Sequence, residues 1–166
     1  MTFWLFILSI RKLIHKILLV IFFIAVILGA VIAIFNYSKQ TNEAFSKAGK
    51  YYLAARTNEE RVKFLEQFGW QVSAEPIEIE NVPIPARFNA VYENYNNIQK
   101  LQGLDLSKYK QQSCTRYTYQ ILNYKNAPNS VRANILVLNN RVIGGDVCSV
   151  ELDGFMHGFA SRDNCN

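Results

Sequence analysis

The sequence is poor in the residues that most metal and redox sites require. It contains two histidines, and since His15 lies beside an apolar N-terminal segment, only His157 remains for the rest of the chain. The three cysteines, Cys114, Cys148 and Cys165, form no C-x-x-C pair. These absences argue against a multi-histidine metal centre, a zinc ribbon and a thioredoxin-like redox site. We therefore expect neither a metal nor a cofactor.

Net charge is also nearly absent from most of the chain. The protein has 166 residues and a net charge of +5, of which Arg11, Lys12 and Lys16 supply +3. Residues 36–166 carry 15 basic and 13 acidic side chains, a net charge of +2, and the two signs are interleaved. A nucleic-acid partner is not expected, because neutralising phosphates requires a clustered basic surface.

Charged and strongly polar side chains are missing altogether from residues 17–35. As a helix this run would be about 28 Å long, close to the hydrocarbon thickness of about 30 Å. A cleaved signal peptide is the main alternative, but the run exceeds the usual signal core of about 7–15 residues and no small-residue cleavage site ends it. We expect a retained transmembrane helix in contact with the lipid bilayer.

The basic residues on the two sides of this run predict its orientation. Three lie within about 15 residues of each end, but those before it are packed more densely. We expect a single-pass protein of the cytoplasmic membrane with its N-terminus inside. Residues 1–16 would lie at the inner surface, residues 36–56 would form a helical stalk, and residues 57–166 would form an extracytoplasmic domain.

Two helices and a strand are expected next. Thr57 and Glu60 have the spacing of a capping box, which predicts a short helix ending at Gly69. Ile77 and Ile79 alternate with glutamates, as in a half-buried strand. The second helix would begin near Pro85 and end at Gly103. Its expected apolar side consists of Phe88, Val91, Tyr95, Ile98 and Leu101, and its solvated side of Asn89, Glu93, Asn94, Asn97 and Lys100.

The remainder predicts an antiparallel meander of three strands, at residues 114–124, 131–138 and 141–152. Asn139-Asn140 suits a two-residue hairpin, because asparagine tolerates positive φ. Gly144-Gly145 indicates a bulge or a close backbone approach. The fold class is therefore α+β, in the order α-β-α-β-β-β, with two helices expected on one face of a curved sheet.

Candidate binding residues are sparse. Tyr117 and Tyr119 would point to the same side of a strand, where they would form either core or an exposed recognition patch. Asp146, Asp153 and His157 are the other candidates, although nothing in their spacing compels these side chains to converge. No catalytic residue is therefore assigned.

The remaining conspicuous residues are given structural roles. Gly144 and Gly145 are weak evidence for phosphate binding, because no helix follows them. Cys148 is interpreted as a small hydrophobe on a strand face, with a disulfide to Cys165 or Cys114 as the alternative.

Three stretches together resemble a known family. They are YN-x-x-Q-K-x-Q-G at residues 95–103, R-Y-T-Y at 116–119 and I-G-G-D at 143–146. Over residues 58–159 the chain is similar to an uncharacterised family of small membrane-anchored proteins from Firmicutes, chiefly clostridia, catalogued as a domain of unknown function. The chain departs from that family's pattern at Gln111 and Lys125. The resemblance implies a Gram-positive host and a membrane-tethered outer domain, without an established activity.

The expected function is a non-enzymatic binding or interaction module that contacts an envelope protein or peptide through its sheet. An inhibitor or regulator of an envelope peptidase is the first alternative. A hydrolase that depends on a thiol or on an Asp/His pair is the second.

Overall fold

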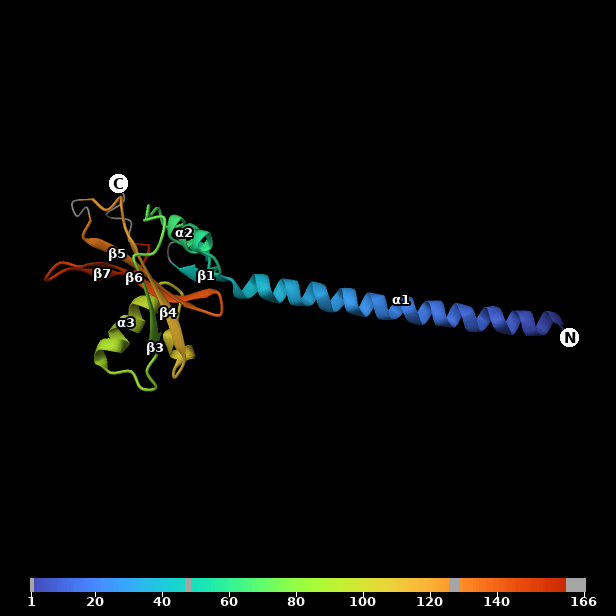
Figure 1. Ribbon diagram of the computed structural model, residues 1–166. Coiled ribbons are helices and arrows are strands. Elements are labelled where there is room, and N and C mark those ends of the chain that lie inside the picture. The colour runs from blue at the N-terminus through green and yellow to red at the C-terminus, as the bar shows by residue number, and fades with distance from the viewer. Residues whose placement is uncertain (1, 47–48, 126–128, 161–166) are drawn as a thin grey trace. The chain divides into compact units, whose positions relative to one another are not determined.

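A computed structural model describes residues 2–46, 49–125 and 129–160. The chain divides into two compact units, Met1–Thr41 and Asn42–Asn166, shown in Figure 1. The first unit is the helix α1 (Thr2–Thr41). It contains the segment His15–Ile34, which has a mean hydropathy of 3.4, side chains exposed throughout, and enough length to cross a membrane. The expected N-terminal apolar helix is therefore present.

The predicted helical stalk is wrong beyond Thr41. Two short antiparallel strands, β1 (Glu43–Ser46) and β2 (Gly49–Tyr52), follow there instead. The alanine-rich composition favoured a helix, but tertiary packing overrides that preference. Ala44 and Tyr51 face each other across the pair and are buried in the core.

The helix α2 (Asn58–Glu66) begins as the sequence predicts. The Thr57 side chain accepts a hydrogen bond from the Glu60 backbone N–H, and the Glu60 side chain accepts from the Thr57 backbone N–H. Phe64 and Leu65 are almost fully buried. Because these two side chains are in the core, α2 is fixed against the sheet as well as capped.

The helix α3 (Ala90–Leu101) presents only part of the expected apolar side to the core. It begins at Ala90, five residues after the inferred start near Pro85, and its N-cap is Asn89. Val91 and Leu101 are exposed, whereas Asn96 and Gln99 are completely buried. The expected solvated side is exposed at all five positions, and Phe88 and Tyr95 of the expected apolar side pack against a core cluster, so the prediction holds in part. What it missed are the two buried amides, which have partners. Asn96 accepts from the Leu106 backbone N–H, in the 3₁₀ helix η1 (Leu106–Tyr109), and Gln99 accepts from that of Gly145.

The sheet is antiparallel and has the order β3-β4-β5-β6-β7. Its strands, visible in Figure 1, are β3 (Glu78–Pro83), β4 (Ser113–Gln120), β5 (Val131–Leu138), β6 (Arg141–Ser149) and β7 (Met156–His157). The α+β class and the predicted order of elements are confirmed. The short β7 was not expected, and β6 ends before the predicted boundary of 152.

The two faces of the sheet carry different side chains. On one, the apolar face, Ile135 and Val147 join a core cluster with Phe64 of α2. On the other, the polar face, Leu136 belongs to a smaller cluster against which Tyr95 of α3 packs. The two helices therefore cover opposite faces rather than one, because α3 buries its aromatic and amide side while α2 buries phenylalanine and leucine.

The turn and the bulge follow the sequence closely. Asn139 and Asn140 connect β5 to β6 with φ values of 51° and 62°. The register between these strands shifts at Leu136/Val137, which places the bulge beside Gly144. Gly145 has φ 152°, and a Cβ there would lie 2.2 Å from the Asn134 carbonyl oxygen. Both the expected bulge and the close backbone approach are therefore present.

Candidate functional site

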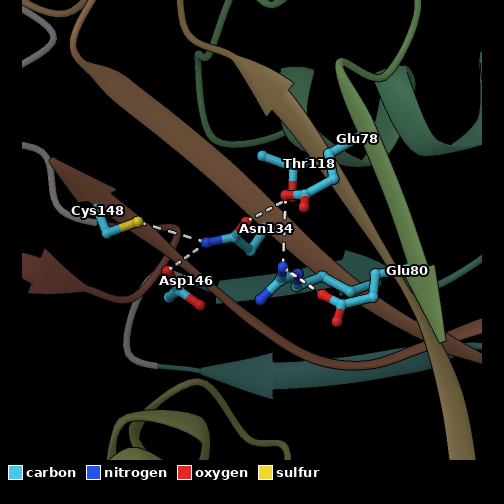
Figure 2. Close-up of polar contacts among 7 residues, drawn as sticks. Glu78, Glu80, Thr118, Asn134, Asp146 and Cys148 are labelled. Atoms are coloured by element: carbon cyan, nitrogen blue, oxygen red, sulfur yellow. Dashed lines mark hydrogen bonds and ion pairs between the residues drawn. The ribbon is translucent and has the colours of Figure 1, made fainter. Parts of the chain in front are cut away.

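A row of interacting polar side chains crosses the polar face of the sheet (Figure 2). It begins on the exposed strand β3, crosses β4 and β5, and ends on β6. We call it the polar row; its members are Glu78, Glu80, Arg116, Thr118, Asn134, Asp146 and Cys148.

The strand register places these residues together. Thr118 of β4 is paired with Asn134 of β5, which is paired with Asp146 of β6. Side chains of directly paired residues lie on the same face, so the three form a line across the strands. On β3, Glu78 is the partner of Thr118 and extends the line to the sheet edge.

Asn134 is the centre of the row. Its Nδ2 donates to Asp146 Oδ2 at 3.0 Å and to Cys148 Sγ at 3.4 Å. Its Oδ1 accepts from the Thr118 hydroxyl at 2.9 Å. One amide of β5 thus joins side chains of the two neighbouring strands, β4 and β6, into a connected network. Arg116 with Glu78 and Glu80 forms a second group of contacts on the same face.

Asp146 is the most buried charged group of the row. Its side chain is 3% exposed, and the Tyr95 hydroxyl of α3 donates to its Oδ1 at 2.9 Å. Burial raises the pKa of this carboxyl above its ordinary value of 3.8, against the opposing effect of its hydrogen bonds with Asn134 and Tyr95. The ionised form is therefore costly in the folded protein.

Cys148 lies beside Asp146 with a half-buried side chain. Burial, followed by the negative charge of Asp146, raises the pKa of its thiol to about 11. Among the residues that the structure describes, neither Cys114 nor Cys148 forms a disulfide, and Cys165 lies outside them. A thiol with this pKa is protonated at neutral pH and is a poor nucleophile.

Arg116 supplies the positive charge of the row. Its Nη2 lies 2.5 Å from Glu80 Oε2 and 3.4 Å from Glu78 Oε2. The side chain as a whole is one third exposed, while its buried Nε has no hydrogen-bond partner among the described residues. The row therefore combines an accessible cation and two exposed carboxylates with neutral amide and hydroxyl groups.

The tyrosines expected as a possible patch face the other side of the sheet. Tyr119 is completely buried, donates to Asn58 Oδ1 at 2.8 Å and accepts from Arg61 Nε at 3.0 Å. Tyr117 is partly buried, and the Arg61 guanidinium carbon lies 3.9 Å from its ring centre. Of the two alternatives, core is therefore the role that the structure gives them.

The three acid-base candidates do not come together. Asp146 lies on the polar face, whereas His157 is paired with Val147 on the apolar face and stacks on Phe155 at 5.2 Å between ring centres. Asp153 lies in the exposed turn between β6 and β7, with φ 61°. Within the part of the chain that the structure describes, no group of three or more histidine, cysteine or acidic residues is placed to hold a metal.

Sequence reasoning missed most of the polar row. Only Asp146 and Cys148 were singled out, and Cys148 was assigned to an apolar surface, whereas it borders the network. A signal was available, because Arg116, Thr118 and Asn134 are polar residues at alternating positions of two apolar strands. Joining them into one site requires the register between strands, which the alternation does not specify.

The comparison with known proteins concerns the same region. A model of a family described as a domain of unknown function, DUF4830, matches residues 64–147, about half of the chain. The matched segment runs from within α2 into β6 and includes six of the seven members of the polar row. No curated protein and no solved structure matches the chain.

Proposed function

The chain belongs to the family described as a domain of unknown function, DUF4830, and we propose that it is a membrane-tethered binding module without catalytic activity. In this proposal α1 spans the cytoplasmic membrane with its N-terminus inside. The unit Asn42–Asn166 lies outside and contacts an envelope protein or peptide through the polar row.

The polar row is the observation that carries the proposal. A sheet face that served only for packing would be covered with apolar side chains, because buried polar groups need partners. Here the face instead keeps the carboxylate of Asp146, which is 3% exposed and has a raised pKa, together with the one-third exposed side chain of Arg116. Titratable groups with a perturbed pKa are more frequent at functional sites than elsewhere. Asp146 is such a group and is buried, so the exposed Glu78 and Glu80 on the same face are the groups that would meet a ligand.

The chemistry of the row suggests a polar ligand. Arg116 offers guanidinium donors, Glu78 and Glu80 offer exposed acceptors, and the strand β3 leaves one of its edges unpaired among the described residues. An extended peptide that pairs with this edge would bring its side chains close to the glutamate carboxylates and to the guanidinium of Arg116. A peptide segment is therefore the ligand class that this surface fits best.

Crosslinking in intact cells tests the proposal. A photoreactive amino acid at Arg132, half-buried on the polar face of β5, should capture a partner, whereas the same group at Lys63, exposed on α2, should not. Binding of the purified partner should then weaken about tenfold in Arg116→Gln, as for a central interface residue. Equal crosslinking from both positions would overturn the assignment of the polar face.

Orientation has its own test. Protease added to intact protoplasts should degrade the unit Asn42–Asn166, because it would lie outside the membrane. The same protease should not reach a tag placed before residue 1 until the membrane is permeabilised. Survival of the C-terminal unit in intact protoplasts would reverse the proposed topology.

One observation favours the alternative of a peptidase regulator. The β6–β7 turn presents Leu152 with 98% of its surface exposed, and the turn is fixed by hydrogen bonds from Ser149 N to the Phe155 carbonyl and from Gly154 N to the Glu151 carbonyl, both 3.0 Å. A rigid turn with an exposed apolar side chain is suited to entering a pocket of a partner, because little entropy is lost on binding.

This alternative predicts a change in membrane-bound proteolysis. Membranes that contain Leu152→Ser should degrade a fluorescent casein at a different rate from membranes with the unchanged chain. Leu122→Ser, which alters another exposed leucine, serves as the matched control. Equal rates in all three preparations would dismiss the regulatory role.

A further inference from the structure

The outer side of the β1–β2 pair is unusually aromatic for an exposed surface. Ala44 and Tyr51 point into the core, so Phe45 and Tyr52, which adjoin them along the strands, point outwards. Phe45 is 69% exposed and Tyr52 is 55% exposed. Two large aromatic side chains on one small ribbon therefore remain uncovered by the rest of the protein.

A lysine accompanies the two rings. Lys50 is the strand partner of Phe45, and its Nζ lies 5.9 Å from the centre of the Phe45 ring and 6.0 Å from that of Tyr52. The same Nζ lies 2.7 Å from Glu43 Oε2. The boundary between lipid and water favours aromatic side chains and lysines, whose apolar stems can lie in the lipid while the charged group stays in water. The ion pair leaves the ribbon with no net charge from these two residues.

The position of the ribbon in the sequence limits where it can be. The apolar segment ends at Ile34, and α1 continues to Thr41, which is a rise of about 10 Å at 1.5 Å per residue. The polar headgroup layer is about 5–8 Å thick on each side of the hydrocarbon. β1 begins one residue beyond Asn42, and the Leu53 N–H donates to the Asn42 carbonyl at 2.8 Å. Both ends of the ribbon are thus held near the membrane surface if α1 crosses it.

We infer that the outer side of the β1–β2 pair is a lipid-docking surface, in which Phe45 and Tyr52 insert into the headgroup region of the bilayer that α1 spans. The inference rests on the proposed membrane tether, but not on which side of the membrane the domain occupies. Aromatic burial drives the contact, so zwitterionic lipid should be sufficient. Docking would fix the domain beside the bilayer instead of leaving it to move freely.

Tryptophan quenching in vesicles tests this contact on the full chain. The change Phe45→Trp adds a fluorophore to the ribbon, and Leu152→Trp adds one at the turn after β6. The two sites are far apart. Arg141, at the start of β6, is bridged to Ala54, which lies near the ribbon, whereas Leu152 follows the last residue of β6. The two ends of β6 are about 27 Å apart along the strand. Emission of the unchanged chain, from Trp4 and Trp70, is subtracted.

Vesicles of phosphatidylcholine with bromine near the headgroup should quench most of the emission added by Phe45→Trp and little of that added by Leu152→Trp. Equal, weak quenching of both would overturn the docking surface. Quenching of Phe45→Trp that appears only when phosphatidylglycerol is included would also overturn it, because charge rather than aromatic insertion would then cause the contact.

A third variant separates this inference from the tether on which it rests. Phe23→Trp lies in the apolar segment and should be quenched by lipids brominated deep in the acyl chains. If Phe23→Trp is quenched and Phe45→Trp is not, the tether stands and the docking surface fails. If Phe23→Trp is not quenched, α1 does not span the bilayer, and the tether itself fails.

Discussion

The side chains on the two faces of the sheet are held in place by different interactions. On the apolar face, Tyr119, Ile135 and Val147 are completely buried in one large core cluster. On the polar face, Asn134 and Asp146 are held by hydrogen bonds beside a smaller cluster. The first arrangement is non-directional and tolerates small shifts, whereas the second depends on the position of each donor and acceptor.

This difference separates stability from recognition. Burial of apolar area is the main favourable contribution to folding, so the apolar face and α2 should account for most of the free energy of unfolding. A hydrogen-bonded network contributes less in net terms, because the same groups bond to water in the unfolded chain. The polar face is therefore the surface where substitutions can change binding while the fold survives.

The largest expected effect comes from removing a core side chain of the apolar face. Trp70 is 1% exposed, its Nε1 donates to the Phe159 carbonyl at 2.8 Å, and its ring stacks on Tyr124 at 5.8 Å between centres. Trp70→Ala should lower the free energy of unfolding by about 3–5 kcal/mol. Urea unfolding followed by far-UV circular dichroism measures it. A loss no larger than that of Asn134→Ala, on the polar face, would contradict the contrast between the faces.

A smaller loss is expected at the centre of the polar row. Asn134→Ala would leave the Asp146 carboxylate and the Thr118 hydroxyl without this partner, which costs about 1–3 kcal/mol. Arg132→Ala is the control on the same strand and face, because its guanidinium bonds only to the carbonyls of Asn129 and Val131 among the contacts described. Equal unfolding free energies for both variants would show that the row is not a network.

Replacing the buried carboxylate by its amide should have a smaller effect still, with a dependence on pH. The pKa of Asp146 is raised above 3.8, so between the ordinary and the raised pKa the folded state binds more protons than the unfolded state. Stability from this group is present below 3.8 and falls as pH rises through that window. Asp146→Asn should remove the decline. Unfolding measured from pH 3 to 8 would contradict this if both chains lost stability in parallel.

The fold was largely predictable where local signals and tertiary packing agree. The Thr57 capping box, the Asn139-Asn140 turn and the alternation in β5 each express a preference of the backbone that the core also satisfies. The prediction of a helical stalk was wrong because Ala44 and Tyr51 reach the core only as a pair of strand residues. No local sequence pattern indicates that contact.

The site was less predictable because it consists of polar side chains from four strands. Asp146 was selected as a possible acid-base partner of Asp153 and His157, but its actual partners Asn134 and Tyr95 lie 12 and 51 residues away. Such groups carry no local signature, since amides and hydroxyls are also common on solvated surfaces. Only the pairing of β4, β5 and β6 brings them together.

The smallest expected effect concerns α3, where apolar spacing and burial disagree. Val91 is 77% exposed despite its place on the expected apolar side, whereas Gln99 is completely buried and bonds to the Gly145 backbone N–H at 2.8 Å. Val91→Ser should therefore change the free energy of unfolding by less than about 0.5 kcal/mol. Gln99→Ala, which leaves that N–H unpaired, should cost about 1–3 kcal/mol. Urea unfolding of both variants measures which of the two side chains contributes more to stability. If Val91→Ser were the more destabilising change, Val91 would be part of the buried side of α3. The helix would then be held on the polar face by apolar contacts rather than by its amides.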